Sequence, residues 1–298
     1  MTLIDYIRRA SARLEQAGVS FGQGTTNAYD EAVWLVLWRL GLPLDDLDGV
    51  AGRELAPNEL APLDALLDER IASRRPAAYL TGEAWLQGVP FWVDERTIVP
   101  RSLIAEVLAE GLIDPWLPAD AKRVLDLCTG NGSLAVLAAL AWPDLQVDAT
   151  DLSVAALAVA ARNVERHGLH DSIRLHAGDG FAAVQARTGN PCYDLILCNP
   201  PYVDAAAMDA LPREFQAEPS LALDGGRDGM DFIRPMLAEA ASHLMPEGIL
   251  VLEIGHGRAA FEVAFPSLEA VWLPTELTDD AVLLVVRQAL VAQAENRS

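Results

Sequence analysis

The spacing of apolar residues divides the chain into two regions with different periods. In residues 1–81, leucine, isoleucine and valine recur every three or four positions, as Leu3, Ile7 and Leu14 do near the start. This period is typical of amphipathic helices, and Asn27 is placed to cap a second one. The first region therefore predicts a small all-helical domain. It carries no catalytic cluster, and either partner recognition or packing alone would account for it.

The apolar period shortens after residue 81. Residues 82–99 carry apolar residues around Gly88 and Pro90, which predicts a β-hairpin linking two domains. Farther on, short apolar runs alternate with helical stretches, and we expect strands at 124–128, 145–150, 172–177, 193–198, 248–254, 270–273 and 281–286. This alternation predicts an α/β fold with a doubly wound, mostly parallel sheet that ends in an antiparallel hairpin.

The strand expected over 193–198 stops at the motif Asn199-Pro200-Pro201-Tyr202. Ligands of open α/β sheets bind beyond the carboxyl ends of the strands, which is where this motif falls. The amide oxygen of Asn199 and a neighbouring backbone carbonyl offer two acceptors to a planar –NH2 group, and Tyr202 offers a ring face. The motif thus predicts a site for an amide or amine. A turn that merely ends the strand is the alternative.

Carboxylates and glycines mark the ends of three other expected strands. Asp126 precedes the tight turn Thr129-Gly130-Asn131-Gly132, and Asp151 and Asp179 end the second and third strands. Glycines in such a turn let backbone N–H groups approach a ligand, and a carboxylate at the second strand can accept both hydroxyls of a ribose. A loop or capping role is the alternative for each aspartate. We expect these strand ends and Asn199 to meet over one pocket.

Two features favour S-adenosylmethionine over a dinucleotide as the cofactor. The third glycine of the dinucleotide-binding motif is absent, because Ala135 stands at that position. Asp126 would place a carboxylate near a cationic amine, and Asp179 would place an acceptor near the amino group of an adenine. S-adenosylmethionine carries an ammonium, a sulfonium and a ribose but no phosphate, so it suits this set of residues.

Composition narrows the possible partners. The formal net charge is −21 and Lys122 is the single lysine, whereas a protein that grips nucleic acid needs clustered cations to replace phosphate counterions. The acidity is compatible with a basic partner or with a merely well-solvated surface. Cys128, Cys192 and Cys198 are too few and too irregularly spaced for a disulfide framework or a zinc site, so we expect no metal. No apolar run approaches the ~18 residues that span a bilayer, and we expect a cytoplasmic protein without a membrane partner.

Three segments of the chain stand out together. They are Asp126-Leu127-Cys128-Thr129-Gly130-Asn131-Gly132, Asn199-Pro200-Pro201-Tyr202 and Glu218-Pro219-x-x-Ala222-Leu223-x-Gly225-Gly226-x-Asp228-Gly229. These segments resemble the protein-glutamine N5-methyltransferases of the HemK/Prm class. The resemblance extends over nearly the whole chain. Two further segments, Val99-Pro100-Arg101-Ser102 and Met208-x-x-Leu211-Pro212-x-Glu214, are more similar to the ribosomal-protein branch of that class.

The resemblance implies the Rossmann-like class I fold of S-adenosylmethionine-dependent methyltransferases. It implies an N-terminal substrate-recognition domain over 1–81, a hairpin linker over 82–99 and a catalytic domain over 100–298. The cofactor implied is S-adenosyl-L-methionine. The substrate implied is a glutamine of a basic ribosomal protein, the third of the large (50S) subunit.

The same resemblance assigns roles to individual residues. The catalytic residues it implies are Asn199, Pro200 and Tyr202. The cofactor-binding residues are Asp126, Thr129, Gly130, Gly132, Asp151, Asp179 and Asn199. The substrate-binding residues are Asn199, Pro200, Pro201 and Tyr202. Three alternatives stay open: methylation of a peptide chain release factor, methylation of adenine N6 in a nucleic acid, and a binding module without catalysis.

Overall fold

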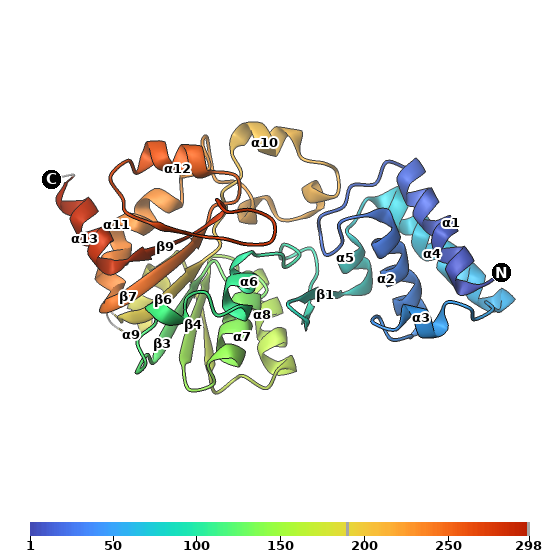
Figure 1. Cartoon of the computed structure of the whole chain (residues 1–298), viewed down its shortest axis with the longest axis horizontal. Coiled ribbons are helices and arrows are strands. Elements are labelled where there is room, and N and C mark those ends of the chain that lie inside the picture. The colour runs from blue at the N-terminus through green and yellow to red at the C-terminus, as the bar shows by residue number, and fades with distance from the viewer. Residues whose placement is uncertain (189–190, 297–298) are drawn as a thin grey trace.

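The computed structural model describes residues 1–188 and 191–296, which form a helical part and a larger α/β part (Figure 1). The helices of the first part are α1 (Leu3–Gln16), α2 (Ala28–Leu40), α3 (Leu47–Val50), α4 (Pro57–Ser73) and α5 (Ala77–Thr81). Asn27 caps α2, since its side chain accepts a hydrogen bond from the Asp30 N–H, as the sequence predicts. None of the helices in the described residues is long and apolar enough to cross a membrane.

The second part is built on a sheet of seven strands. They are β3 (Arg123–Leu127), β4 (Gln146–Asp151), β5 (Ile173–Ala177), β6 (Tyr193–Cys198), β7 (Leu244–Glu253), β8 (Val271–Leu273) and β9 (Val282–Val286). Their order is β5-β4-β3-β6-β7-β9-β8, and the first five in this order are parallel. Strand β9 is antiparallel to both β7 and β8, so the sheet and its C-terminal hairpin are confirmed.

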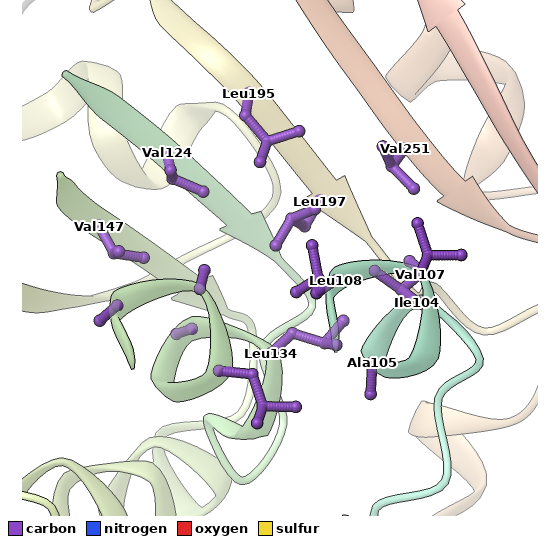
Figure 2. Packing of buried hydrophobic residues seen from close by; sticks show 14 of the residues in the cluster. Ile104, Ala105, Val107, Leu108, Val124, Leu134, Val147, Leu195, Leu197 and Val251 are labelled. Atoms are coloured by element: carbon purple, nitrogen blue, oxygen red, sulfur yellow. The ribbon is translucent and has the colours of Figure 1, made fainter. Parts of the chain in front are cut away.

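Helices cover both faces of this sheet. They are α6 (Ile104–Ala109), α7 (Ser133–Ala141), α8 (Val154–Arg166), α9 (Ala182–Thr188), α11 (Ile233–His243), α12 (Arg258–Ala264) and α13 (Arg287–Glu295). A further helix, α10 (Ala205–Ala210), has no buried residues and belongs to the segment that follows β6. Figure 2 shows Ile104 and Leu108 of α6 in one layer with Leu195 and Leu197 of β6. The intervening Ile196 belongs to the opposite layer, beneath α11. Because both faces are buried, the central strands β6 and β9 are almost continuously apolar, which is why their positions are readable from the sequence; β4 and β5 carry more polar residues.

The two parts are joined by a hairpin that is shorter than the sequence predicts. Strands β1 (Glu83–Leu86) and β2 (Val89–Trp92) pair antiparallel, and the pairing ends at Trp92 rather than near residue 99. The chain turns away because the Asp94 carboxylate accepts hydrogen bonds from both the backbone and the guanidinium of Arg96. Residues 93–99 are thereby free to run toward the carboxyl ends of the sheet strands.

A buried ion-pair network fastens the helical part to the α/β part. Arg70 of α4 is 1% exposed and donates to Glu31 of α2 at 2.9 Å. Arg74, which follows α4, donates to the Glu214 carboxylate at 3.1 Å, and Gln23 donates to the Glu214 carbonyl at 3.3 Å. Glu214 belongs to the loop after α10, so the helical part is attached directly beside that loop.

Candidate active site

The strand order changes direction between β3 and β6. From β3 the chain adds β4 and β5 on one side, and then returns to place β6 and β7 on the other side. Leu127 at the end of β3 pairs with Cys198 at the end of β6, so the glycine-rich turn and the Asn-Pro-Pro-Tyr motif leave the same edge of the sheet side by side. This reversal is where open α/β sheets bind ligands. The expectation that these strand ends meet is confirmed.

A first cavity lies over the carboxyl ends of β3, β4, β5 and β6. Of the residues singled out in the sequence, it is lined by Gly130, Asp151, Asp179, Asn199 and Pro201. Its other walls come from segments that the strand pattern alone does not mark, including Thr97, Ile98, Leu152, Leu221 and Phe232. Asp151 and Asp179 are thus brought together with Gly130 and Asn199, whereas the third expected carboxylate, Asp126, is not among the residues that line the cavity.

A second cavity adjoins the first at Asn199. It is lined by Pro200 and Tyr202 of the same motif, by Arg101, by Phe215 and by Glu253. The residues common to both cavities are Ile98, Asn199 and Ala222. Asn199 therefore lies where the two cavities meet. The polar residues at the strand ends line the first cavity, and Pro200 and Tyr202, which follow Asn199, line the second.

The turn after β3 is held by the carboxylate at the end of β4. The Gly130 N–H donates to Asp151 Oδ2 at 2.9 Å, and the Ser153 N–H donates to Asp151 Oδ1 at 2.8 Å. Burial raises the pKa of Asp151, while these two hydrogen bonds work in the opposite direction. Each carboxylate oxygen has a second lone pair, so Asp151 can still accept hydroxyl groups from the cavity.

Asp126 lies beneath the turn rather than in the wall of either cavity. It is 0% exposed, and its Oδ2 accepts from Thr129 Oγ1 at 2.5 Å and from the Ala135 N–H at 3.1 Å. Its Oδ1 is buried and has no hydrogen-bond partner in the described structure. Burial raises the pKa of Asp126 to about 7. Thr150 Oγ1, in the wall of the first cavity, is a second buried oxygen without a partner in the described structure, and of the two the carboxylate oxygen is the one that suits a cationic group, which fits a cofactor with an ammonium.

Thr129 and Gly132 also shape the turn from below. Neither is among the residues that line the two cavities. Gly132 has φ +81°, and a Cβ at this position would lie 3.1 Å from the Ala160 Cβ, so α8 can pack closely against the turn only because residue 132 is a glycine. The structure thus places the two residues as supports for Gly130, the member of the motif that faces the cavity.

The Asn-Pro-Pro-Tyr loop is fixed by the glycine-rich segment after Glu218. The Val203 N–H donates to the Leu223 carbonyl at 2.9 Å, and the Gly225 N–H donates back to the Val203 carbonyl at 2.8 Å. A Cβ on Gly225 would lie 2.7 Å from the Tyr202 Cα, so the two segments can only pair closely with glycine there. The position of the Asn-Pro-Pro-Tyr loop therefore depends on the glycine-rich segment.

Glu253 is a residue of the site that the sequence reasoning missed. It ends β7, it is buried, and its carboxylate accepts from Ser102 Oγ at 2.5 Å, from the Leu103 N–H at 2.9 Å and from the Tyr202 hydroxyl at 3.2 Å. Burial raises the pKa of Glu253, against the effect of these hydrogen bonds. Its position at the end of the fifth expected strand was the available signal.

Arg101 and Glu218 form an ion pair at the site, and the sequence did not predict this pair. Arg101 donates to both carboxylate oxygens of Glu218, at 2.7 and 2.8 Å, and the Val99 N–H donates to the same carboxylate at 2.9 Å. A bidentate arginine–carboxylate pair holds both partners in one orientation. The pair joins the segment before α6 to the loop that carries Ala222, and Arg101 lines the second cavity over the Phe215 ring. Both residues lie in segments that the resemblance singled out.

No group of histidine, cysteine, aspartate and glutamate side chains suited to a metal ion occurs in residues 1–188 and 191–296. The oxygens and N–H groups that converge at the strand ends are instead those of backbone, carboxylate and amide groups.

Two family models match parts of this chain. Residues 105–226 match the family described as methyltransferase small domain, and residues 5–82 match the PrmC N-terminal domain. A methyltransferase from Pyrococcus furiosus is 18% identical, over 78% of this chain and 99% of that chain, with a TM-score of 0.48. The fold, the strand-end site and the matched family define a methyltransferase that uses S-adenosylmethionine as its cofactor.

Full-length relatives identify the family within this class. The ribosomal protein uL3 glutamine methyltransferase of Bordetella pertussis is 54% identical, over 97% of this chain and 96% of that protein. The enzyme of the same description from Burkholderia pseudomallei is 49% identical, over 98% of this chain and 97% of that protein. The chain belongs to the family of ribosomal protein uL3 glutamine methyltransferases.

Proposed function

We propose that this chain transfers a methyl group from S-adenosylmethionine to the side-chain nitrogen, N5, of a glutamine in ribosomal protein uL3, the third protein of the 50S subunit. The observation that carries the proposal is the position of Asn199 where the two cavities meet. The full-length relatives of this chain are named for glutamine methylation of uL3, which supports the choice of substrate. The cytoplasm, where ribosomal proteins are made, is the proposed place of action.

In this proposal the first cavity holds the cofactor. S-adenosylmethionine supplies an activated methyl group on a positively charged sulfonium. Asp151 would accept the ribose hydroxyls, Asp179 would accept from the adenine amino group, and the Gly130 backbone would lie against the ligand. Asp126, beneath the turn, would keep the turn in shape with Thr129 and Gly132, and the charge on its unpaired Oδ1 would attract the ammonium from behind the cavity wall.

The second cavity would hold the glutamine. An amide nitrogen is a poor nucleophile because its lone pair is delocalised into the carbonyl, so the site must position it rather than merely bind it. Asn199 Oδ1 and the Pro200 carbonyl would each accept one amide hydrogen, which aims the nitrogen at the first cavity. Pro201 and Tyr202 complete the loop, and Tyr202 would pack against the amide plane. These fixed acceptors also stabilise the positive charge that develops on the nitrogen.

The proposed division of the chain follows from this site. Residues 1–81 would recognise the substrate protein, 82–99 would link, and 100–298 would carry the chemistry. A basic ribosomal protein complements a chain with a net charge of −21, and no direct contact with nucleic acid is needed. The helical part is tied through Arg74 to Glu214, close to the second cavity, so a substrate held by both parts is sterically reasonable.

Labelled S-adenosylmethionine tests the proposal directly. The enzyme is incubated in parallel with unmethylated uL3, with unmethylated release factor and with DNA, and the labelled product is digested and sequenced by mass spectrometry. We expect label on one glutamine of uL3. Label on release factor in preference to uL3, label on DNA, or no label on any of the three would each contradict the proposal.

A further inference from the structure

A cavity of about 500 Å³ lies away from the strand ends, between the helical part and the hairpin. Two tryptophans stand in its wall, Trp34 from α2 and Trp85 from β1. Two aspartates join them, Asp30 from the first turn of α2 and Asp45 from the loop after it. The cavity is thus bounded by two carboxylates and one indole ring of the helical part and by one indole ring of the hairpin.

The aromatic side of the cavity is held in place. Trp85 is 45% exposed, and its indole N–H donates to Glu83 Oε1 at 3.1 Å, which orients the ring. Gly24 has φ +100°, and a Cβ at this position would lie 3.2 Å from the ring of Trp34, so a glycine is needed for the loop to pass this close to that ring. The faces of indole rings attract cations, more strongly than those of other aromatic side chains.

In the described residues, the two aspartates of the cavity are not paired with a lysine or arginine side chain. Neither Asp30 nor Asp45 takes part in an ion pair among the residues that the structure describes, and the Asp30 carboxylate accepts from the neutral side-chain amide of Asn27 at 2.7 Å. No lysine or arginine is among the described residues that line the cavity. Two negative charges beside two indole rings complement a guanidinium or an ammonium group.

The cavity lies close to the proposed glutamine site. Gly22 packs against the ring of Phe215, where a Cβ would lie 3.3 Å from the ring, and Phe215 lines the second cavity. Gly24 and Thr25, a few residues along the same loop, line the acidic and aromatic cavity. Two residues of chain span at most about 7 Å, so one loop lines the acidic and aromatic cavity and, close by, contacts a side chain that lines the second cavity.

We propose that this cavity binds an arginine or lysine side chain of the protein substrate, near in sequence to the target glutamine. The proposal rests on the proposed function and specifies how the helical part takes part in it. A substrate segment laid across the loop at Gly22 could place its glutamine in the second cavity and a basic side chain between Trp34 and Trp85. The net charge of −21 draws a basic protein toward this surface and disfavours an acidic one.

Steady-state kinetics of the full chain test the contact with the substrate. Asp45→Asn and Trp85→Ala each change an exposed residue, and melting temperature and calorimetric cofactor affinity verify that the variants fold. We expect each to raise KM for uL3 roughly five- to tenfold while kcat and cofactor affinity stay unchanged, because a cation–π or carboxylate contact is lost outside the reacting centre. Asp48→Asn is the matched control, since Asp48 is exposed, in the same acidic segment, and does not line the cavity.

A small-molecule probe tests the cavity without any turnover. N-acetyl-arginine amide is titrated into the ¹⁵N-labelled enzyme, and the indole resonances of Trp34 and Trp85 are assigned with Trp34→Phe and Trp85→Phe. We expect both to shift in the wild type and to shift less in Asp45→Asn, whereas N-acetyl-glutamine amide leaves them in place. Shifts of equal size with both probes would overturn the proposal.

The two experiments separate this proposal from the proposed function. If the wild type methylates uL3 and Asp45→Asn and Trp85→Ala have the same KM as Asp48→Asn, the basic-side-chain site is wrong and the glutamine activity stands. If the wild type does not methylate uL3, the proposed function is wrong, and the titration alone then decides whether the cavity selects a basic side chain.

Discussion

The hydroxyl of Tyr202 donates a hydrogen bond to Oε1 of Glu253 across 3.2 Å, and this contact joins the end of β6 to the end of β7. The other oxygen of Glu253 accepts from Ser102 Oγ at 2.5 Å and from the Leu103 N–H at 2.9 Å. One buried carboxylate therefore fixes two walls of the second cavity, the Asn-Pro-Pro-Tyr loop and the start of α6. Glu253 acts on the proposed reaction through Tyr202 and is a positioning residue.

Replacing this carboxylate is expected to impair the chemical step more than cofactor binding. Glu253→Gln keeps the size of the side chain but presents an amide –NH2 to donors that need an acceptor, so we expect a stability loss of about 1–3 kcal/mol and a fall in kcat of at least tenfold. Tyr202→Phe is the milder comparison, since it removes one hydrogen bond worth about 0.5–1.5 kcal/mol. Denaturant unfolding, calorimetry with S-adenosylmethionine and uL3 methylation rates measure the three effects. A Glu253→Gln enzyme with wild-type kcat would contradict the positioning role.

The raised pKa of Asp126 predicts a pH dependence of stability. Its pKa is about 7 in the folded protein, because the carboxyl is buried, and about 3.9 in an unfolded chain. Between these values the folded state holds a proton that the unfolded state has released, so this contribution to stability is present at low pH and is lost as pH rises toward 7. We expect wild type to lose on the order of 2 kcal/mol between pH 5 and pH 8 through this group.

The variant Asp126→Asn isolates that contribution. Its side chain cannot ionise, and its oxygen can still accept from Thr129 and from the Ala135 N–H. The unfolding free energies of wild type and variant are measured by denaturant titration at several pH values. We expect their difference to shift in favour of the variant as pH rises from 5 to 8, because only the wild type loses stability through this group. A difference that is constant across this range would show that Asp126 is not the titrating group.

Cys128 has an unusual backbone conformation that predicts how two substitutions at this position differ in stability. Its φ is +59°, in the left-handed region that costs residues with a Cβ roughly 1–2 kcal/mol and costs glycine nothing. We expect Cys128→Gly to be more stable than Cys128→Ala by about 1 kcal/mol, because both lose the thiol and only the alanine keeps the steric cost. Denaturant unfolding of the two variants gives this difference. Equal stability, or a more stable alanine variant, would contradict the argument.

How far the fold could be predicted depends on the length and period of each element. The buried strands and the long helices α1, α2 and α4 give clear apolar patterns and lie close to where the sequence predicts, except that β7 begins at Leu244, before the expected start at residue 248. Helices α3 and α5 have four and five residues, too few to show a helical period. The hairpin was predicted too long because Ile98 is apolar, whereas Asp94 turns the chain directly after Val93, whose N–H makes the last hydrogen bond across the hairpin, to the Gly82 carbonyl.

The candidate site was predictable to the extent that it lies at strand ends. Gly130, Asp151, Asp179 and Asn199 follow buried strands, and the parallel topology brings them together. The contacts of Glu253 are not readable in this way, since Ser102 is 151 residues away in sequence and the pairing depends on how α6 packs. The sequence also does not show how deeply a side chain is buried. For this reason Asp126 was expected to face the ligand, whereas it lies beneath the turn.

The central claim is that Asn199 holds the glutamine while the neighbouring strand ends hold the cofactor. The most direct measurement compares Asn199→Ala with Asp151→Ala, using calorimetry for S-adenosylmethionine affinity and single-turnover methylation of uL3 for the chemical step. We expect Asn199→Ala to slow methylation by roughly 100-fold or more with cofactor affinity changed less than about threefold, and Asp151→Ala to weaken cofactor binding at least tenfold. If both variants weaken cofactor binding equally, and Asn199→Ala methylates at the wild-type rate once saturated, the account is contradicted.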